Sequence, residues 1–430
     1  MKKWINTSLA LGTLGASAVL VGSALRMTRY VKKELQQADH KAPPLHSGDQ
    51  APKVVLMVPC RGLDPDFREN MAMLTAQDYP NYEIIFMTAN AADKSYPVLQ
   101  EMVQRSPVPA RIVFGGFSKQ RCQKLDNMLA AIDDISNRDA QPDIYAWADS
   151  DARVTAEWLR YLVAPLSRPE VGATTTYRWY RPEHRRPLTH VLALWTGIQI
   201  THMHVNANVA VWGGSMAVRR ETFDQLKMRE IWQTALADDC VLNDTVRKAG
   251  LRVEFVVPAM TSLSSDHSVK DILIFAVRQC VIGKHTLKPI WWPSIFALSL
   301  FHFSAGRGAW LLGRSLLKRQ APPWQAWGML SFLPAGILQG LTVIQLMRQI
   351  KKARNPQDPL EARYSWAAYS PLAYLFTWFS LAASGLTNRF VWRDIVYRMH
   401  NAHRTEVCFY PPELETAQSE EDAPSGAKRS

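Results

Sequence analysis

Residues 145–154 read YAWADSDARV, and in this stretch an apolar run ends abruptly in Asp-Ser-Asp. Residues 145–148 are typical of the end of a buried strand. Asp149 and Asp151 lie two residues apart, so an extended chain places both carboxylates on the same side. Two close carboxylates repel each other unless a positive group lies between them. The stretch therefore leaves two interpretations open: a site for a hard divalent cation that substrate phosphates complete, or a polar turn that caps a helix beginning near Thr155.

The composition indicates a membrane protein. Hydrophobic residues make up 47% of the 430 residues and charged residues only 20%, which is low for a soluble protein. The net charge is +12, and the Lys and Arg residues cluster beside long apolar runs. This distribution favours anionic lipid headgroups over nucleic acid as the partner. The five cysteines are widely spaced with no CxxC pair, which argues against a disulfide framework and favours a reducing compartment.

The chain begins with an apolar run of membrane-spanning length at residues 4–25. Two lysines precede the run, and four basic residues follow it between positions 26 and 33. Because a basic flank is typical of the cytoplasmic side, we predict that residues 1–35 form a transmembrane anchor. The alternative is a cleaved signal peptide. Residues 36–52 are polar and contain proline, as expected for a linker.

Residues 53–285 alternate between strand and helix patterns. Apolar runs predict strands at 53–60, 81–90, 110–116 and 143–151, and helical segments fall at 67–77, 96–105 and 123–135. This alternation predicts an α/β domain with a mostly parallel sheet. Functional groups in such sheets collect at the carboxyl ends of the strands. Three polar segments occupy such positions: 61–64, 90–93 and 149–151.

After residue 285 the chain becomes strongly apolar again. Runs at 290–312, 327–347 and 366–386 have spanning length, so we expect residues 286–400 to hold two or three transmembrane helices and an interfacial helix. If all three late runs span, the basic segment 388–400 falls on the non-cytoplasmic side, against the usual charge rule. An interfacial or re-entrant run is the alternative. Residues 401–430 are predicted to be a polar, disordered tail.

Three further segments carry candidate chemistry. Asp238 and Asp239 begin a predicted helix, where they could stabilise the helix dipole or act as a catalytic base. Lys124 lies one helical turn before Asn127, so it could contact a phosphate or simply belong to an amphipathic surface. The Gly-Gly-Ser segment at 213–215 allows a backbone to approach a ligand closely, or forms an ordinary turn between strands.

Together these segments resemble one known family. The stretches VPCRGLDPDFREN, AQDYPNYEIIF, CQKLDN, ADSDARV, VWGGSMAVRR and LADDCVLNDTVRKAG occur in order over about residues 54–290. The set resembles membrane-bound family 2-type glycosyltransferases with a GT-A (Rossmann-like) fold, and is most similar to the ceramide glucosyltransferase branch. The resemblance also covers the placement of one N-terminal and several C-terminal membrane segments. It implies an α/β GT-A domain at residues 53–285.

The resemblance implies a role for each acidic segment. Asp149 and Asp151 would hold Mg²⁺ or Mn²⁺ against the donor diphosphate, and Lys124 would contact the donor. Asp239 would be the catalytic base, with Asp238 beside it.

A further position of the family falls after the second predicted strand. Asp93 would lie near the nucleotide base and ribose, although a strict alignment places Asn90 there instead. The reaction implied is inverting transfer of a sugar from a nucleotide-sugar donor, expected to be a UDP-sugar, to a lipid acceptor. The acceptor would be ceramide-like or another glycolipid precursor. The catalytic domain would lie on the cytoplasmic face of the membrane, the inner membrane if the source is bacterial.

One family motif departs from the pattern. The family carries Gln/Arg-x-x-Arg-Trp near the membrane, and Arg278 and Gln279 occupy the corresponding region here without a following Arg-Trp pair. The motif helps bind acceptor and diphosphate, so its degeneration implies a divergent acceptor or lost activity. Two alternatives stay open: a processive polysaccharide synthase, and a non-catalytic membrane module that binds nucleotide sugars.

Overall fold

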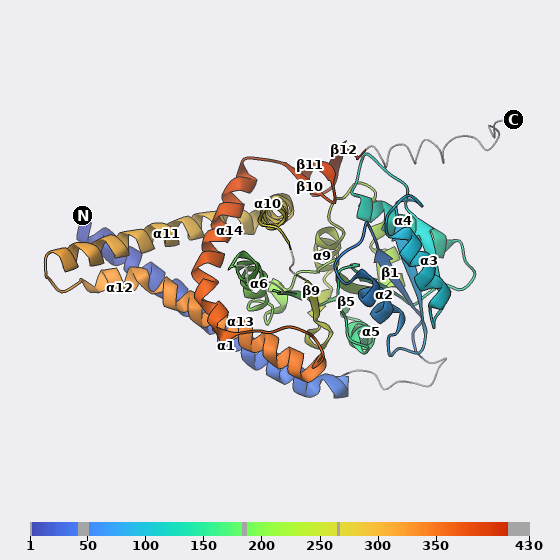
Figure 1. Cartoon of the computed structure of the whole chain (residues 1–430), viewed down its shortest axis with the longest axis horizontal. Helices are drawn as coiled ribbons and strands as arrows, with labels where there is room; N and C mark the ends of the chain where they lie inside the picture. The colour runs from blue at the N-terminus through green and yellow to red at the C-terminus, as the bar shows by residue number, and fades with distance from the viewer. Residues whose placement is uncertain (1, 42–50, 183–186, 265–266, 412–430) are drawn as a thin grey trace. The chain divides into compact units, whose positions relative to one another are not determined.

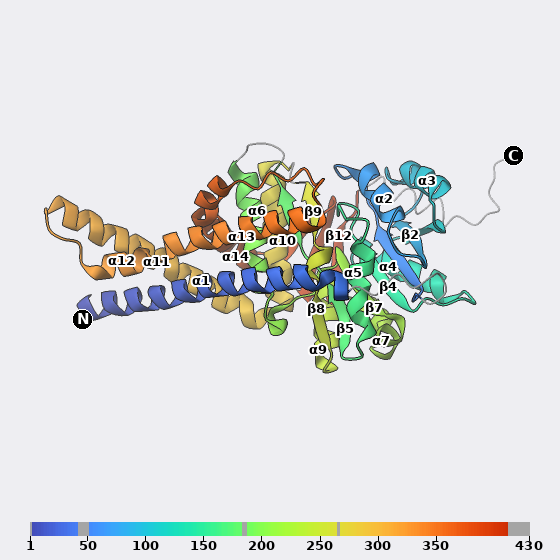
Figure 2. The same ribbon diagram turned by 90° about the horizontal axis from the view of Figure 1, so that it is seen from below.

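The computed structural model describes residues 2–41, 51–182, 187–264 and 267–411. The chain divides into two compact units, which are described separately (Figures 1 and 2). The sheet unit comprises Gln36–Arg178, Val209–Ser264 and Thr387–Ser430, and the helical unit comprises Met1–Leu35, Trp179–Asn208 and Ser265–Leu386. Each unit is therefore assembled from segments that are distant in the sequence.

The sheet unit is built on a seven-stranded sheet with the order β3-β2-β1-β4-β7-β5-β8. Parallel pairing joins β1 to β2 and β4, β2 to β3, and β5 to β8, whereas β7 is antiparallel to both of its neighbours. The strands are β1 (Val54–Pro59), β2 (Tyr82–Thr88), β3 (Ala110–Phe114), β4 (Ile144–Ala148), β5 (Val171–Thr175), β7 (Ser215–Arg219) and β8 (Arg252–Phe255). The predicted mostly parallel α/β sheet is confirmed.

The helices of this unit follow the strands closely. They are α2 (Phe67–Thr75), α3 (Tyr96–Arg105), α4 (Gln123–Ser136), α5 (Trp158–Val163), α7 (Arg220–Gln225), α8 (Met228–Trp232) and α9 (Asp238–Lys248). Short 3-10 helices η2 (Ala164–Ser167) and η4 (Val257–Ala259), and strand β9 (Thr261–Ser264), complete this part. The predicted helical segments at 67–77, 96–105 and 123–135 correspond to α2, α3 and α4.

Alternating side chains bury both faces of the sheet. Val54, Leu56 and Val58 of β1 pack in a core shared with α2, α3 and α5. On the other face α4 contacts β1, β2 and β3, and Trp147 of β4 packs edge-to-face against Trp232 at 5.5 Å. A sheet buried on both sides leaves its strand ends as the places where polar groups can gather.

A second, three-stranded sheet belongs to the same unit. It consists of β10 (Arg389–Trp392), β11 (Ile395–Asn401) and β12 (Arg404–Phe409) in sequential antiparallel order. These strands occupy residues that were predicted as the end of the membrane segments (286–400) and the start of a disordered tail (401–430). The physical reason is visible in β11, where Ile395, Tyr397 and Met399 are buried and the residues between them are not. Residues 412–430 of the predicted tail lie outside the described ranges.

The helical unit contains α1 (Lys2–Lys41), α6 (Pro187–Ile200), α10 (Val269–Thr286), α11 (Lys288–Leu317), α12 (Trp324–Leu330), α13 (Phe332–Arg354) and α14 (Ser370–Gly385). Two short 3-10 helices, η3 (Asn206–Asn208) and η5 (Tyr364–Tyr369), lie between them, and β6 (Arg178–Arg181) leads into this unit. The last residues of α1 fall in the predicted linker 36–52, of which 42–50 lie outside the described ranges.

Three helical segments in the described ranges are long and apolar enough to cross a membrane: Lys3–Ala38, Lys288–Leu317 and Trp324–Arg354. They correspond to the predicted anchor and to two predicted C-terminal spans. The third late run, 366–386, forms η5 and then α14 of 16 residues, which is shorter than the roughly 20 residues that a span needs.

Polar and small side chains join the long helices to one another. α1, α11 and α12 lie side by side in both views (Figures 1 and 2). Thr13 of α1 shares a hydrogen bond with Ser304 of α11 at 2.8 Å, and Gln325 of α12 donates to Thr7 at 3.2 Å. A Cβ on Gly328 would lie 2.9 Å from that of Ala10, so glycine allows the helices to approach. Such contacts are the usual means of helix association in lipid.

Candidate active site

Lys124 is the centre of a charged cluster at the carboxyl end of β4. Its Nζ atom lies 2.9 Å from Asp149 Oδ1, donates to the carbonyl of Gly213 at 3.0 Å, and lies 3.3 Å from Asp238 Oδ2. Asp149 follows β4, Gly213 precedes the antiparallel β7, and Asp238 begins α9. Three segments that were singled out separately in the sequence therefore meet at one ammonium group.

Asp239 joins the same cluster through the backbone. Its Oδ2 atom accepts a hydrogen bond from Gly213 N at 3.0 Å, and its Oδ1 atom accepts one from Cys240 N at 2.7 Å. Asp238 is buried, whereas Asp239 keeps an intermediate exposure. Of the two carboxylates, Asp239 is thus the one held in place and still accessible to a ligand.

The two glycines before β7 are required by this close packing. A Cβ on Gly213 would lie 2.9 Å from Lys124 Nζ, and one on Gly214 would lie 2.6 Å from Asp149 Oδ2. Both separations are shorter than real Cβ contacts, so any side chain here would displace a charged group. The Gly-Gly segment is a turn before β7 that lets the backbone approach charged side chains closely. Its approach to a ligand stays a prediction.

Burial and the ion pairs act in opposite directions on the pKa values of these groups. Burial would raise the pKa of Asp149, but Lys124, Arg178 and Arg393 together outweigh it and lower that pKa. Burial would lower the pKa of Lys124, but Asp149 and Asp238 raise it overall. Burial also raises the pKa of Asp238 to about 6 against the opposing effect of Lys124. The lysine and Asp149 are therefore a charged pair at neutral pH.

Asp151 has a different environment, which fits a cation. Burial, followed by the charges of Asp64 and Asp149, raises the pKa of Asp151 to about 7. Its Oδ1 atom is buried and has no hydrogen-bond partner among the described residues. A buried carboxylate oxygen without a hydrogen bond, close to two other carboxylates, is an arrangement that a hard divalent cation would stabilise.

The protein ligands alone do not make a complete metal site. Within the described ranges, no set of three or more His, Cys, Asp or Glu side chains is arranged to hold a metal ion. Mg²⁺ is commonly bound by one or two carboxylates together with substrate phosphates. Asp149 and Asp151 fit this incomplete kind of site, in which the donor supplies the remaining ligands.

The predicted nucleotide-side residues follow β1 and β2. Asp93 Oδ1 accepts hydrogen bonds from Gly62 N at 2.9 Å and from Ser95 N at 2.8 Å, so this carboxylate ties the two loops together. Asn90 is buried, and its Nδ2 atom lacks a partner in the part of the chain that the structure describes. Both residues offered for the nucleotide contact thus lie at the same edge of the sheet, and their role stays a prediction.

Arg278 and Gln279 belong to α10 of the helical unit. The guanidinium of Arg278 lies 5.3 Å from the ring centroid of Phe275 one turn earlier. Their predicted contact with the donor stays a prediction.

Of two further residues near the acidic cluster, the sequence analysis included Asp64 only as part of the polar segment 61–64, and it missed Arg393. Asp64, in the loop after β1, accepts a hydrogen bond from Ser150 Oγ at 2.7 Å. Arg393, in the β10–β11 turn, pairs with Asp64 at 2.5 Å. The loop after β1 was recognised as a strand end, which is the signal for Asp64. Nothing local marks Arg393, because its partner lies more than three hundred residues earlier.

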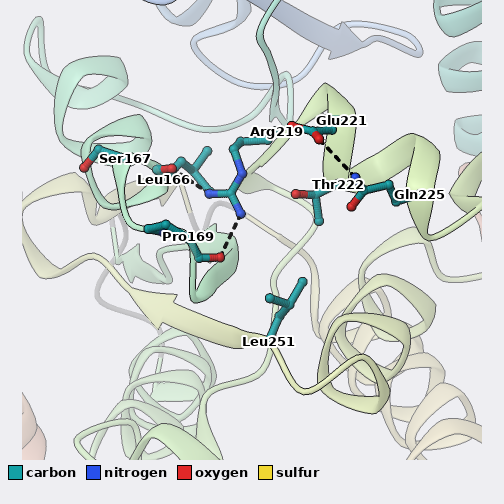
Figure 3. Close-up of a pocket in the computed structure, with 8 residues that line it drawn as sticks. All are labelled: Leu166, Ser167, Pro169, Arg219, Glu221, Thr222, Gln225 and Leu251. Atoms are coloured by element: carbon teal, nitrogen blue, oxygen red, sulfur yellow. Dashed lines mark hydrogen bonds between the residues drawn. The ribbon is translucent and has the colours of Figure 1, made fainter.

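A pocket of about 340 Å³ lies at the opposite edge of the sheet (Figure 3). It is lined by Leu166, Ser167, Pro169, Arg219, Glu221, Thr222, Gln225 and Leu251. The guanidinium of Arg219 points into it and donates to the carbonyls of Leu166 and Pro169 at 2.6 and 3.2 Å. Because Arg219 pairs with Ile144 at the start of β4, this pocket lies away from the carboxylates that follow Ala148.

The mixed sheet with carboxylates at the end of β4, together with the membrane-type helices, defines a membrane-associated glycosyltransferase of the GT-A type. The chain belongs to glycosyl transferase family 21, whose pattern matches residues 14–405. A beta-monoglucosyldiacylglycerol synthase of Synechocystis sp. is 27% identical over 146 residues, which are 32% of this chain and 29% of the synthase. The match thus spans less than a third of that relative.

One solved structure is also similar in part. It is a mannosyltransferase from Pyrobaculum calidifontis in complex with GDP-Man and Mn²⁺, at 15% sequence identity and a TM-score of 0.42. The similarity covers 89% of this chain and 98% of that one.

Proposed function

We propose that this protein transfers a sugar, with inversion, from a nucleotide-sugar donor, expected to be a UDP-sugar, to a lipid acceptor. The observation that carries the proposal is the convergence of Lys124, Asp149, Asp238 and Asp239 on the Gly-Gly segment before β7. Lys124 gives this cluster a positive charge, and Asp239 gives it an accessible carboxylate. Donor binding and proton removal need these two features side by side.

The proposed reaction assigns one task to each group. The carboxylate of Asp239 takes the proton of the acceptor hydroxyl as its oxygen forms a bond to the anomeric carbon. The bond from that carbon to the diphosphate oxygen breaks, and the nucleoside diphosphate leaves with the electron pair. Attack opposite the leaving group inverts the anomeric carbon. Lys124, held by Asp149, supplies positive charge beside the diphosphate, where charge develops.

A divalent cation, Mg²⁺ or Mn²⁺, would be held by Asp149 and Asp151 and would supply Lewis-acid stabilisation of the leaving group when bound. The unpartnered Oδ1 atom of Asp151 supports this assignment. The cation would bind together with the donor, because the residues that the structure describes offer only part of a coordination shell.

A lipid acceptor is supported by the membrane helices and by the relative. Three segments have spanning length and composition, and the partly matching synthase is named for a glucosyldiacylglycerol product. The basic residues after the apolar part of α1 support a cytoplasmic catalytic unit. We expect the sugar to be transferred at that face of the bilayer.

The test is a transfer assay on the full chain in detergent with a native lipid extract and Mn²⁺. Radiolabelled UDP- and GDP-sugars are offered in turn, and label is followed into the organic phase. We expect one donor to label lipid, and Asp239→Asn to lower the rate by about 10²- to 10⁴-fold, the usual contribution of a general base. Donor binding by this variant should persist.

The matched control is Asp244→Asn on the same helix, where Asp244 is exposed and pairs with Lys248 at 2.7 Å. It should transfer at the wild-type rate. Label in a water-soluble polymer would instead support a polysaccharide synthase. Nucleotide binding without any product would support a non-catalytic module, and full activity of Asp239→Asn would remove this residue as the base.

A further inference from the structure

The C-terminal sheet carries one residue to the acidic cluster. Trp392 pairs with Ile395, so β10 and β11 are joined by the two-residue turn Arg393–Asp394. Both turn residues have positive φ angles, 53° and 66°, in a turn that normally favours asparagine and glycine. An arginine is thus held in a backbone conformation that arginine rarely adopts.

The side chain of Arg393 reaches the carboxylate of Asp64, which follows β1. Its Nη2 atom lies 2.5 Å from Asp64 Oδ1, and the other oxygen of Asp64 accepts the hydrogen bond from Ser150. Ser150 is the residue between Asp149 and Asp151, and the charge of Arg393 acts on both of these aspartates. The arginine is therefore a second cation at the place where the donor diphosphate is proposed to bind.

The C-terminal sheet is anchored to the segment that carries the first cation. The hydroxyl of Tyr397, which is buried, accepts a hydrogen bond from Gln123 N at 3.2 Å, one residue before Lys124. Val407 N donates to the carbonyl of Lys119 at 3.0 Å. The sheet thus fixes its turn relative to the loop before α4, so that Arg393 is presented by a supported element.

We propose that Arg393 binds the diphosphate of the donor, so that residues after the last membrane helix complete the donor site. The inference rests on the proposed function. Asp64 is contacted through Nη2, and 39% of the Arg393 side chain stays exposed. A planar guanidinium can grip two phosphate oxygens at once, which a single ammonium cannot do. Arg393 would also stabilise the charge that develops on the leaving diphosphate.

The test measures nucleotide affinity, independently of catalysis, by titration calorimetry on the full chain in detergent with Mn²⁺. UDP and GDP are compared with uridine and guanosine, which lack the diphosphate. We expect Arg393→Gln to weaken binding of the preferred diphosphate at least tenfold and to leave binding of its nucleoside within twofold. The matched control is Arg398→Ala in β11, whose partner is Glu406 at 3.6 Å, and it should bind like the wild type.

Asp64→Asn separates a phosphate contact from a structural ion pair. It removes the negative partner but keeps the arginine, so diphosphate affinity should stay the same or increase. An equal loss of diphosphate affinity in Asp64→Asn and Arg393→Gln would overturn the proposal, as would wild-type affinity in Arg393→Gln. If the unaltered chain binds neither diphosphate, the proposed function itself fails, and this inference fails with it.

Discussion

Replacing Gly213 with alanine tests whether the cluster around Lys124 is the active site. The new Cβ would lie less than 3.0 Å from Asp238 Oδ2 and 2.9 Å from Lys124 Nζ, whereas ordinary contact begins at 3.4 Å. The charged side chains must therefore withdraw by roughly 1 Å to reach a normal separation. Asp239 is the next residue along α9 and is held by Gly213 N, so the proposed base would move with them.

The size of the expected effect follows from this displacement. A shift of about 1 Å at a catalytic group can lower the rate by about 10²-fold. We therefore expect Gly213→Ala to reduce kcat for lipid transfer about 100-fold. The overpacking should cost about 1–3 kcal/mol in the free energy of unfolding. Thermal unfolding in detergent would show that the variant is still folded.

A glycine with open space provides the control. A Cβ on Gly313 of α11 would meet no atom within 4 Å, so Gly313→Ala should keep the wild-type kcat within twofold. The assay is initial-rate transfer of labelled sugar into lipid at saturating donor. A folded Gly213→Ala protein with unchanged kcat would refute the reasoning, because the proposed base would then tolerate a displaced neighbour.

Three other substitutions test separate parts of the structure. Lys124→Met should lower the free energy of unfolding by about 3–5 kcal/mol in a denaturant titration, because Asp149 and buried Asp238 would lose their shared cation. The affinity for Mn²⁺ in the presence of UDP should rise as the pH increases from about 6 to 8. The reason is that the Asp151 carboxyl, with a pKa of about 7, must lose its proton before it can bind a cation. Asp151→Asn should abolish this pH dependence. Gly328→Leu should lower the unfolding temperature in detergent, since a side chain there meets α1, at an expected cost of about 1–3 kcal/mol.

The parts of the fold that the sequence predicted are those with local patterns. Each of the first four strands is a short apolar run, and each of the first three predicted helices has its own periodicity. The 14-residue helix α6 was placed inside the catalytic domain, although it belongs to the helical unit. The β10–β12 strands were read as membrane flank and tail because basic residues masked the alternation at Ile395, Tyr397 and Met399.

The candidate site was predictable only where its residues flank such elements. Lys124, Asp149 and Asp239 could be found because they lie at the ends of predicted elements. The contact of one ammonium with two carboxylates, however, depends on the strand order, and no local pattern determines that order. The positions of Asp64 and Arg393 depend on a contact between the first loop of the sheet unit and its last hairpin. Such a pairing of distant segments has no signature in a single sequence.

The return of the chain to the sheet unit favours one of the topologies that the sequence left open. The chain leaves this unit after Ser264 and re-enters it at Thr387. If this unit lies wholly on one side of a membrane, the intervening segment crosses an even number of times. Two segments there, Lys288–Leu317 and Trp324–Arg354, have the length and composition to span. With two crossings, the basic segment 388–400 would lie on the same side as the proposed catalytic residues, where the charge rule places it if that side is the cytoplasm.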